Sequence, residues 1–372
     1  MTPARQSTGG VSPSDSKLKA RKAAGPVAPS VTWDIGTAYD LFASLFVLHN
    51  AEAIGLRRAW AAGVRNRLVP EHREFLQKIV PVVGVPVEWI RSLDGRRSVE
   101  SVLAGLDTLP PEAVLESMVD TRLVESDVVQ RVRNRGEYRQ NDVDSLLADR
   151  SIGMAVPDDP QQATNILELF ARNASSGDLL KDALDEYVTR FFKEEEMRIE
   201  PFLHDSLATA QKKANTADLV ELVEDLSGGL RLEDLANVPR VMLIPSFWAG
   251  PLVLFETLPD DTHVILFSAR PRHVSLIPGD PVPDSLVRAL QAVSDQTRLR
   301  ITRILAAQPR SQIESARELR LRPPTITHHL KILRMANLVR LTESTGGEKR
   351  YDIRETRLRE LLGDLMSFTG IE

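Results

Sequence analysis

The 372-residue sequence predicts a mainly α-helical protein with a small β-sheet, ending in a helix–turn–helix and a two-stranded β-hairpin. Three observations support this fold class. Apolar residues recur at helical spacing between Thr32 and about Arg231. Short apolar runs bounded by Pro, Gly and Asp follow at about 240–268. Two short helical patterns and an alternating hairpin pattern then occupy the C-terminal quarter. The length alone favours two or three domains.

Residues 1–28 are predicted to form a disordered basic tail. This stretch is rich in Ser, Gly, Pro and Ala, and it contains five basic residues against one acid, Asp15. Such a composition cannot bury enough apolar surface to fold. The tail is interpreted either as a solvated segment or as an arm that touches phosphate without sequence preference.

No segment is predicted to cross or be exported through a membrane. The tail has no apolar core behind its basic residues, which excludes a secretory signal. The longest apolar run, Val241–Phe255, is shorter than a spanning helix and contains Pro245 and Pro251. The absence of cysteine excludes disulfides and thiolate metal sites. The sequence therefore predicts a soluble, cytoplasmic protein.

Residues 29–279 are predicted to form a mainly helical effector or regulatory domain. Pro70 and Pro110-Pro111 mark helix starts, and a long apolar stripe runs from Leu180 to Phe192. The small sheet is expected at about 240–268, with Leu258-Pro259-Asp260-Asp261 as a hairpin loop between its last two strands. These are packing patterns, and they predict no chemistry.

Residues 280–372 are predicted to form a winged helix-turn-helix. Asp295 is a suitable N-cap for one helix, because its carboxylate can accept the free amides of the first turn. Gly346-Gly347 favours the tip of a hairpin. The expected elements are helices at 285–293 and 296–307, the helix pair 313–319 and 323–337 joined by the turn 320–322, strands at 339–341 and 350–353, and a last helix at 354–368.

The second helix of the pair has two distinct faces at about 100° per residue. Ile326, His329, Leu330, Leu333 and Asn337 fall on one side and are predicted to face inward. Pro324, His328, Lys331 and Met335 fall on the opposite side. His329 is therefore expected to be a packing residue with one satisfied ring nitrogen, whereas His328 projects outward.

Charge is unevenly distributed along the chain. Residues 284–372 contain 16 Arg and Lys against 11 Asp and Glu, a net charge of +5, whereas the preceding residues carry 31 against 41, a net charge of −10. A basic C-terminal module on an acidic remainder indicates a polyanionic partner. Recognition helices place their N-terminal residues against base edges, and a wing can reach phosphates. The predicted DNA contacts are Arg320, Arg322, Pro324, Thr325, Thr327, His328, Lys331, Arg340, Lys349 and Arg350, with Glu343 and Glu348 tempering the wing.

Two motifs resemble the signature stretches of the ArsR (arsenical-resistance repressor) family of bacterial winged-helix regulators. They are Asp295-Gln-Thr-Arg-Leu-Arg-Ile and Pro324-Thr-Ile-Thr-His-His-Leu-Lys-Ile-Leu-Arg. The resemblance covers roughly residues 284–368. It implies a homodimer with helices 285–293 and 354–368 as its interface, a palindromic double-stranded DNA operator, and a repressor relieved by an inducer.

The sequence also departs from that family. The metal-sensing members carry a cysteine pair in the first helix of the pair, where this chain has Ile313-Glu314-Ser315-Ala316. Arg320 and Arg322 replace the usual turn glycine and helix cap, and Pro323 and Pro324 follow. The family's base preference therefore does not carry over. The large N-terminal region resembles extensions of longer ArsR-type regulators and is expected to sense a small-molecule effector or a partner.

Two other functions stay open. A winged helix without specific DNA binding could serve as a protein-interaction module. A metal-dependent enzyme could use Glu196, Glu200 and His204, which are spaced i, i+4, i+8, although Pro201 is expected to interrupt that helix. We predict no enzyme activity, catalytic residue, metal ligand or cofactor. Phe247, Trp248 and Phe255 are interpreted as core residues, with the wall of an effector pocket as the alternative.

Overall fold

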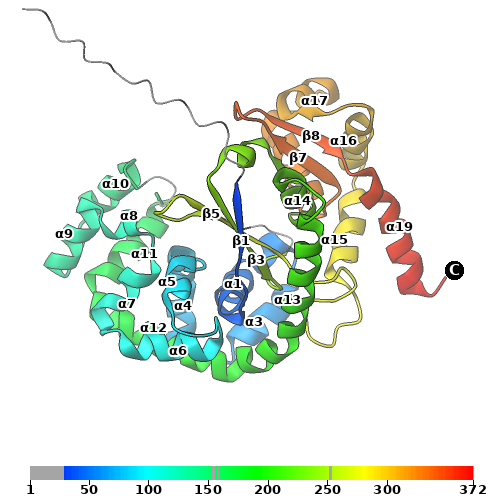
Figure 1. The fold of residues 1–372 in the computed structure, drawn as a ribbon. Coiled ribbons are helices and arrows are strands. Elements are labelled where there is room, and N and C mark those ends of the chain that lie inside the picture. Colours follow the sequence, from blue (N-terminus) through cyan, green and yellow to red (C-terminus); the bar gives the residue numbers. More distant parts are fainter. Residues whose placement is uncertain (1–28, 153–155, 158, 251–253, 372) are drawn as a thin grey trace, which may run out of the picture.

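The computed structural model describes residues 29–152, 156–157, 159–250 and 254–371. Helices curve around a small sheet, and a second, smaller group of helices and strands packs beside them, with α19 projecting from it (Figure 1). We call residues 29–279 the body and residues 280–372 the C-terminal module. The prediction of a mainly α protein with a small β component is confirmed. The predicted tail, residues 1–28, lies outside the described residues.

The helices of the body pack on two apolar cores, one on each face of its sheet. In chain order they are α1 (Thr37–His49), α2 (Ala51–Ile54), α3 (Arg58–Arg65), α4 (Pro70–Val83), α5 (Val87–Ser92), α6 (Val99–Thr108), α7 (Pro111–Met118), α8 (Thr121–Val124), α9 (Asp127–Arg135), α10 (Gln140–Ala148), α11 (Pro160–Ala171), α12 (Asn173–Tyr187), α13 (Lys193–Ala214) and α14 (Leu219–Leu226).

The sheet of the body has the strand order β1-β3-β5-β4. Strands β1 (Ser30–Trp33), β3 (Arg240–Ser246) and β5 (Thr262–Ser268) are parallel, and β4 (Leu254–Thr257) pairs antiparallel with β5. The predicted sheet at about 240–268 and the hairpin loop before β5 are confirmed, although residues 251–253 of this stretch lie outside the described residues. The prediction of helix from Thr32 was wrong, because Ser30–Trp33 forms a parallel edge strand.

Helices α12 and α13 are joined by the π-helical turn η2 (Val188–Phe192). The predicted apolar stripe is buried here, with Leu180, Tyr187 and Phe192 at most 2% exposed. Pro201 was predicted to interrupt the helix, and this was wrong: α13 continues through it to Ala214. Proline removes one amide donor, and the long helix retains its other bonds and its packing on the core.

The C-terminal module has its own apolar core, centred on Ile301, Ile326, Leu330 and Leu333. Asp295 caps α16 as predicted, accepting a hydrogen bond from the amide of Arg298. The elements are α15 (Asp284–Val293), α16 (Gln296–Ala307), β6 (Arg310–Ser311), α17 (Gln312–Leu319), α18 (Pro323–Met335), β7 (Val339–Glu343), β8 (Lys349–Ile353) and α19 (Glu355–Thr369).

The wing sheet extends beyond the predicted pair of strands. Its order is β2-β7-β8-β6, and β2 (Leu230–Leu232), which follows α14 and precedes the 3₁₀ turn η3 (Glu233–Asn237), comes from the body. β2 pairs parallel with β7, with Leu230 opposite Leu341 and Leu232 opposite Glu343. The outer edge of β7 is therefore paired with the body. The domain division at residues 279 and 280 stays a prediction.

Candidate nucleic-acid interface

Helix α17 begins with a reciprocal cap and ends in a left-handed residue. Ser311 Oγ accepts from the amide of Glu314 at 3.2 Å, and Glu314 Oε2 accepts from the amide of Ser311 at 2.7 Å. Arg320 has φ 55°, in the left-handed region of backbone conformation, where glycine is the least strained residue. The predicted tight turn is thus present, and Arg320 projects its exposed side chain from it.

Helix α18 begins without a side-chain cap. Arg322 is its N-cap and supplies no cap hydrogen bond, while Pro323 and Pro324 occupy the first turn. Because proline has no amide hydrogen, these two positions leave no free donors to satisfy. Gln312 Nε2 donates to Pro323 O at 3.0 Å, which ties the start of α18 to the start of α17.

The two predicted faces of α18 are confirmed in their main features. Ile326, Leu330 and Leu333 are at most 1% exposed. On the other side, Pro324, Thr325, Thr327, His328 and Lys331 are exposed, and Met335 is half-buried. Thr327 Oγ1 donates to Pro323 O at 3.0 Å, so this oxygen can still accept hydrogen bonds from outside the chain.

Three cations on and beside α18 have no carboxylate partner within the part of the chain that the structure describes. This holds for Arg320, Arg322 and Lys331, all exposed. Their charges are therefore available to an external anion. Together with Thr325, Thr327 and His328 they form one polar, positively charged surface, which we call the α18 surface.

The cations of the wing are all paired. Lys349 Nζ lies 3.4 Å from Glu343 Oε2, and Arg350 Nε lies 2.9 Å from Glu348 Oε1. Arg340 is paired with Asp352 and with an acid of the body, Glu224. The wing thus carries less free positive charge than the α18 surface.

Two residues of α18 have contacts that the sequence did not predict. His329 is half-buried as expected, but its Nδ1 has no hydrogen-bond partner in the described structure and lies 4.0 Å from Asp295 Oδ1. Nδ1 is therefore not the satisfied ring nitrogen that was expected. Burial lowers the pKa of His329. Arg334 faces the body, where its Nη1 donates to Ser227 O at 3.4 Å and burial lowers its pKa to about 10.

A groove of about 450 Å³ separates α18 from the body. His328, Lys331 and Met335 line it from α18, and Glu52 and Gly55 line it from the opposite side. Part of the outward face of α18 therefore looks across at the α2 segment of the body rather than into open solvent.

The last helix exposes an apolar surface. Leu361 is buried in the module core, whereas Leu362 is 65%, Met366 44% and Phe368 46% exposed. This stripe includes part of the surface that the family resemblance assigns to a dimer interface. Of the other predicted interface helix, α15, Leu286 is buried within the chain and Val287 is exposed.

Of the residues considered for a metal-dependent enzyme, Glu196 has a structural role, and Glu200 and His204 are exposed. Glu196 Oε1 accepts from the Thr37 hydroxyl and, at 3.1 Å, from the amide of Val99. No group of three or more His, Asp and Glu within the described ranges is placed to hold a metal ion. Phe247 and Trp248 are fully buried, as expected for core residues, whereas Phe255 is 39% exposed, so its assignment to the core was wrong. Among the described helices, none is long and apolar enough to cross a membrane.

Sequence reasoning missed the residues at the junction between body and module. Glu224, Arg270 and Arg288 lie there, and each reaches across to the other part of the chain or to its neighbouring loop. No motif surrounds them, and their charges are ordinary for helix and loop positions. The one available signal concerns the two arginines, each of which lies next to apolar residues in the sequence.

Comparisons with known proteins agree with this geometry. The family model described as "Bacterial regulatory protein, arsR family" matches residues 295–340, from the cap of α16 to β7. The HTH-type transcriptional regulator Rv2034 of Mycobacterium tuberculosis is 38% identical over 81 residues, which cover 22% of this chain and 75% of that protein. No solved structure matches. The chain therefore belongs to the arsR family of bacterial regulatory proteins.

Proposed function

We propose that this protein is a sequence-specific, dimeric transcriptional repressor that acts in the cytoplasm and catalyses no reaction. The observation that carries the proposal is the α18 surface: its cations lack carboxylate partners in the described structure, while the opposite face of α18 is fixed in the module core. A recognition helix needs this combination, because its polar side chains must meet bases and phosphates from a rigid support.

In this proposal, α18 of each protomer enters the major groove of one half-site of a palindromic operator. Arg322 can pair bidentately with guanine, and Thr325 and His328 offer further donors at the same end of the helix. Lys331 and Arg320 contact phosphates and supply affinity without sequence preference. Lys349 and Arg350 reach phosphates only after exchanging their acidic partners.

The dimer forms through α19, whose exposed leucine and methionine stripe would otherwise stay in water. The two-fold symmetry of the dimer accounts for a palindromic operator. The body biases the spacing of the two recognition helices. It senses a small molecule or a partner. Such an effector changes DNA binding only if it binds one spacing of the recognition helices more tightly than the other.

Genome-wide DNA co-precipitation in the source organism tests the proposal. The recovered site is then titrated with the purified protein at about 50 and 200 mM salt, alongside random DNA of equal length. We expect an enriched palindromic site, a large preference over random DNA, and a steep loss of affinity with salt. No enriched site and only weak, unselective binding would instead favour a protein-interaction module.

A further inference from the structure

A cavity of about 280 Å³ lies where the body meets the C-terminal module. Gly250 and Ser268 line it from the carboxyl ends of the parallel strands β3 and β5, the edge at which open sheets commonly bind ligands. Ser285 on α15 and Arg357 on α19 line the other side. Its volume lies just below the roughly 300 Å³ at which ligand pockets usually begin, so it suits only a small ligand.

Positive charge dominates the lining of this junction cavity. Two acids are present, Asp225 and Glu360. The basic residues are five arginines from three separate segments of the chain: Arg270, Arg272, Arg288, Arg354 and Arg357.

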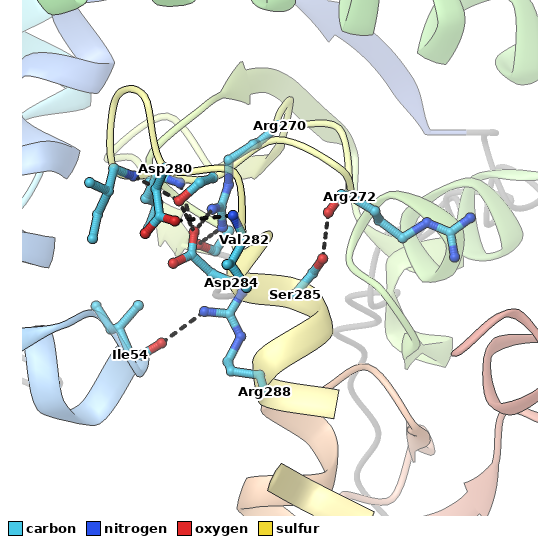
Figure 2. A network of polar contacts seen from close by, with 12 residues as sticks. Ile54, Arg270, Arg272, Asp280, Val282, Asp284, Ser285 and Arg288 are labelled. Atoms are coloured by element: carbon cyan, nitrogen blue, oxygen red, sulfur yellow. Dashed lines mark hydrogen bonds and ion pairs between the residues drawn. The ribbon is translucent and has the colours of Figure 1, made fainter. Parts of the chain in front are cut away.

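Some of these arginines are already neutralised within the chain. Arg270, whose side chain is 5% exposed, lies 2.7 Å from Asp284 Oδ2, as the polar cluster in Figure 2 shows. That carboxylate also accepts from the amide of Leu276 at 2.6 Å. Arg357 lies 2.6 Å from Asp364, and Arg272 is paired with Glu360.

Arg288 and Arg354 lack such partners. Arg288 Nη1 donates to Ile54 O at 3.0 Å (Figure 2), and Arg354 Nη1 donates to Asn337 O at 3.2 Å. In the described part of the structure, neither guanidinium has a carboxylate within 4.0 Å. Burial lowers the pKa of Arg288 to about 10, and the charge of Arg270 acts in the same direction. A carbonyl satisfies a donor but does not compensate a buried charge.

We propose that the junction cavity binds a small organic anion bearing a carboxylate or phosphate group, and that the bound anion weakens DNA binding. The planar guanidinium fork matches both groups through two parallel hydrogen bonds. Arg288 and Arg354 supply the uncompensated charge, and Ser268 lines the same cavity with its hydroxyl, whereas the Ser285 hydroxyl already donates to Arg272 O. The regulatory part of this inference rests on the proposed function.

The coupling to DNA follows from the position of Arg288. This residue lines both the junction cavity and the groove over α18, and it holds the α2 segment through Ile54 O. In this arrangement Glu52 and Gly55 stand opposite His328 and Lys331. A duplex on that part of α18 needs the space occupied by α2. An anion that bridges body and module stabilises the present arrangement and opposes the DNA-bound one.

Isothermal titration calorimetry of the full-length protein with inorganic phosphate, and separately with citrate, tests the cavity. Ionic strength is held constant with chloride throughout. We expect saturable binding of one anion per chain for at least one of the two probes. Phosphate alone would identify a phosphoryl ligand, and citrate alone a carboxylate ligand. No saturable binding of either anion would overturn the proposal.

Three variants assign the site. Arg288→Gln removes the uncompensated charge, and Ser285→Glu places a carboxylate in the cavity at a first-turn helix position that tolerates acids. Both variants should abolish anion binding. If Arg288→Gln disturbs packing, Ser285→Glu still tests the cavity. Arg150→Gln removes an equal charge at an exposed position next to α10, far from α15 and α19 in Figure 1, and should bind as the wild type does.

The effect on DNA separates this inference from the proposed function. At saturating anion, operator affinity should fall at least about fivefold in the wild type and in Arg150→Gln, and stay unchanged in the other two variants. Equal losses in all four proteins would mean competition at the DNA surface and would overturn the coupling. Absence of any preferred DNA site would count against the proposed function alone, because calorimetry still reports on the cavity.

Discussion

Glu224 of α14 and Arg340 of β7 form an ion pair that joins the body to the wing, with Oε1 and Nε 2.5 Å apart. The same carboxylate lies 2.9 Å from Arg231 Nη1 on β2, the strand that extends the wing sheet. Asp352 adds a second acid, 3.3 Å from Arg340 Nη1. Arg340 is therefore neutralised within the chain, and its proposed phosphate contact requires that these pairs loosen.

Glu224→Gln should strengthen DNA binding. The substitution removes the acid shared by Arg340 and Arg231. Arg231 is then free for a phosphate, and Arg340 keeps only its longer contact with Asp352. Each additional phosphate contact should make the slope of log affinity against log salt steeper by about 0.9. Titration of operator and random DNA at several salt concentrations measures this slope. Glu221→Gln, an exposed acid on the same helix, is the matched control and should leave the slope unchanged. A weaker or unaltered slope in Glu224→Gln would show that the pair does not restrain Arg340.

Lys331→Ala should weaken binding to operator and random DNA by the same factor. In the proposal the Lys331 ammonium contacts a phosphate as a point charge, and such a contact carries no sequence information. The salt slope should become shallower by about 0.9, the contribution of one phosphate contact. Fluorescence anisotropy with both duplexes measures the two affinities. A loss confined to the operator would instead make Lys331 a base reader.

Arg322→Ala and His328→Ala should reduce specificity. Both side chains lie on the exposed N-terminal half of α18. Loss of a good base contact should cost the operator about 1–3 kcal/mol while random DNA is nearly unaffected. Competition titrations of operator variants, one base pair at a time, would locate the position that each residue reads. Equal losses on operator and random DNA would rule out base reading by these two residues.

The C-terminal module could be predicted closely because its signals are local. Asp295 before a helical pattern specifies a cap, and the spacing of Ile326, Leu330 and Leu333 specifies a buried face. A reverse turn likewise depends on nearby residues such as Gly346 and Gly347. Each of these signals acts over a few residues, so no knowledge of distant segments was needed.

The remaining features depend on distant partners. β1 is a strand because it pairs with β3, which follows it by about 200 residues, and Ser30–Trp33 alone carries no comparable signal. β2 joins the wing for the same reason. The sequence also could not show which arginines of the predicted site are paired with an acid. Nothing near Arg340 or Arg322 in the sequence distinguishes them, and only the fold places Glu224 beside Arg340.

Leu362→Asp should convert a dimer into monomers. Leu362 is 65% exposed on α19 beside Met366, and a carboxylate there would have to be desolvated in a dimer interface. Sedimentation equilibrium measures the change, and operator affinity should fall with it because one protomer reaches only one half-site. Met197→Asp, at a 68% exposed position on α13, is the control and should not alter association. A Leu362→Asp dimer as stable as the wild type would place the interface elsewhere.

Asp40→Asn should flatten the dependence of stability on pH. Asp40 is fully buried, and its Oδ1 accepts from Ser246 Oγ at 2.6 Å and from the Trp248 amide at 2.8 Å, while Oδ2 has no partner in the described structure. Burial raises its pKa from 3.8 to about 7, and the nearby Glu195 adds to the rise.

The sign of the effect follows from proton binding. Between pH 4 and 7 the folded protein holds a proton on Asp40 that the unfolded chain has released, so the free energy of unfolding falls as the pH rises. The slope from this one group is on the order of 1.4 kcal/mol per pH unit. Asparagine cannot titrate, and it keeps an oxygen acceptor for Ser246 and Trp248. Urea unfolding at several pH values should therefore show that the free energy of unfolding of Asp40→Asn rises relative to that of the wild type up to about pH 7. Above that pH the difference between the two proteins should stay constant. Asp178→Asn, at an exposed position on α12, should follow the wild type throughout. Parallel curves for wild type and Asp40→Asn below pH 7 would mean that Asp40 is ionised in the folded protein.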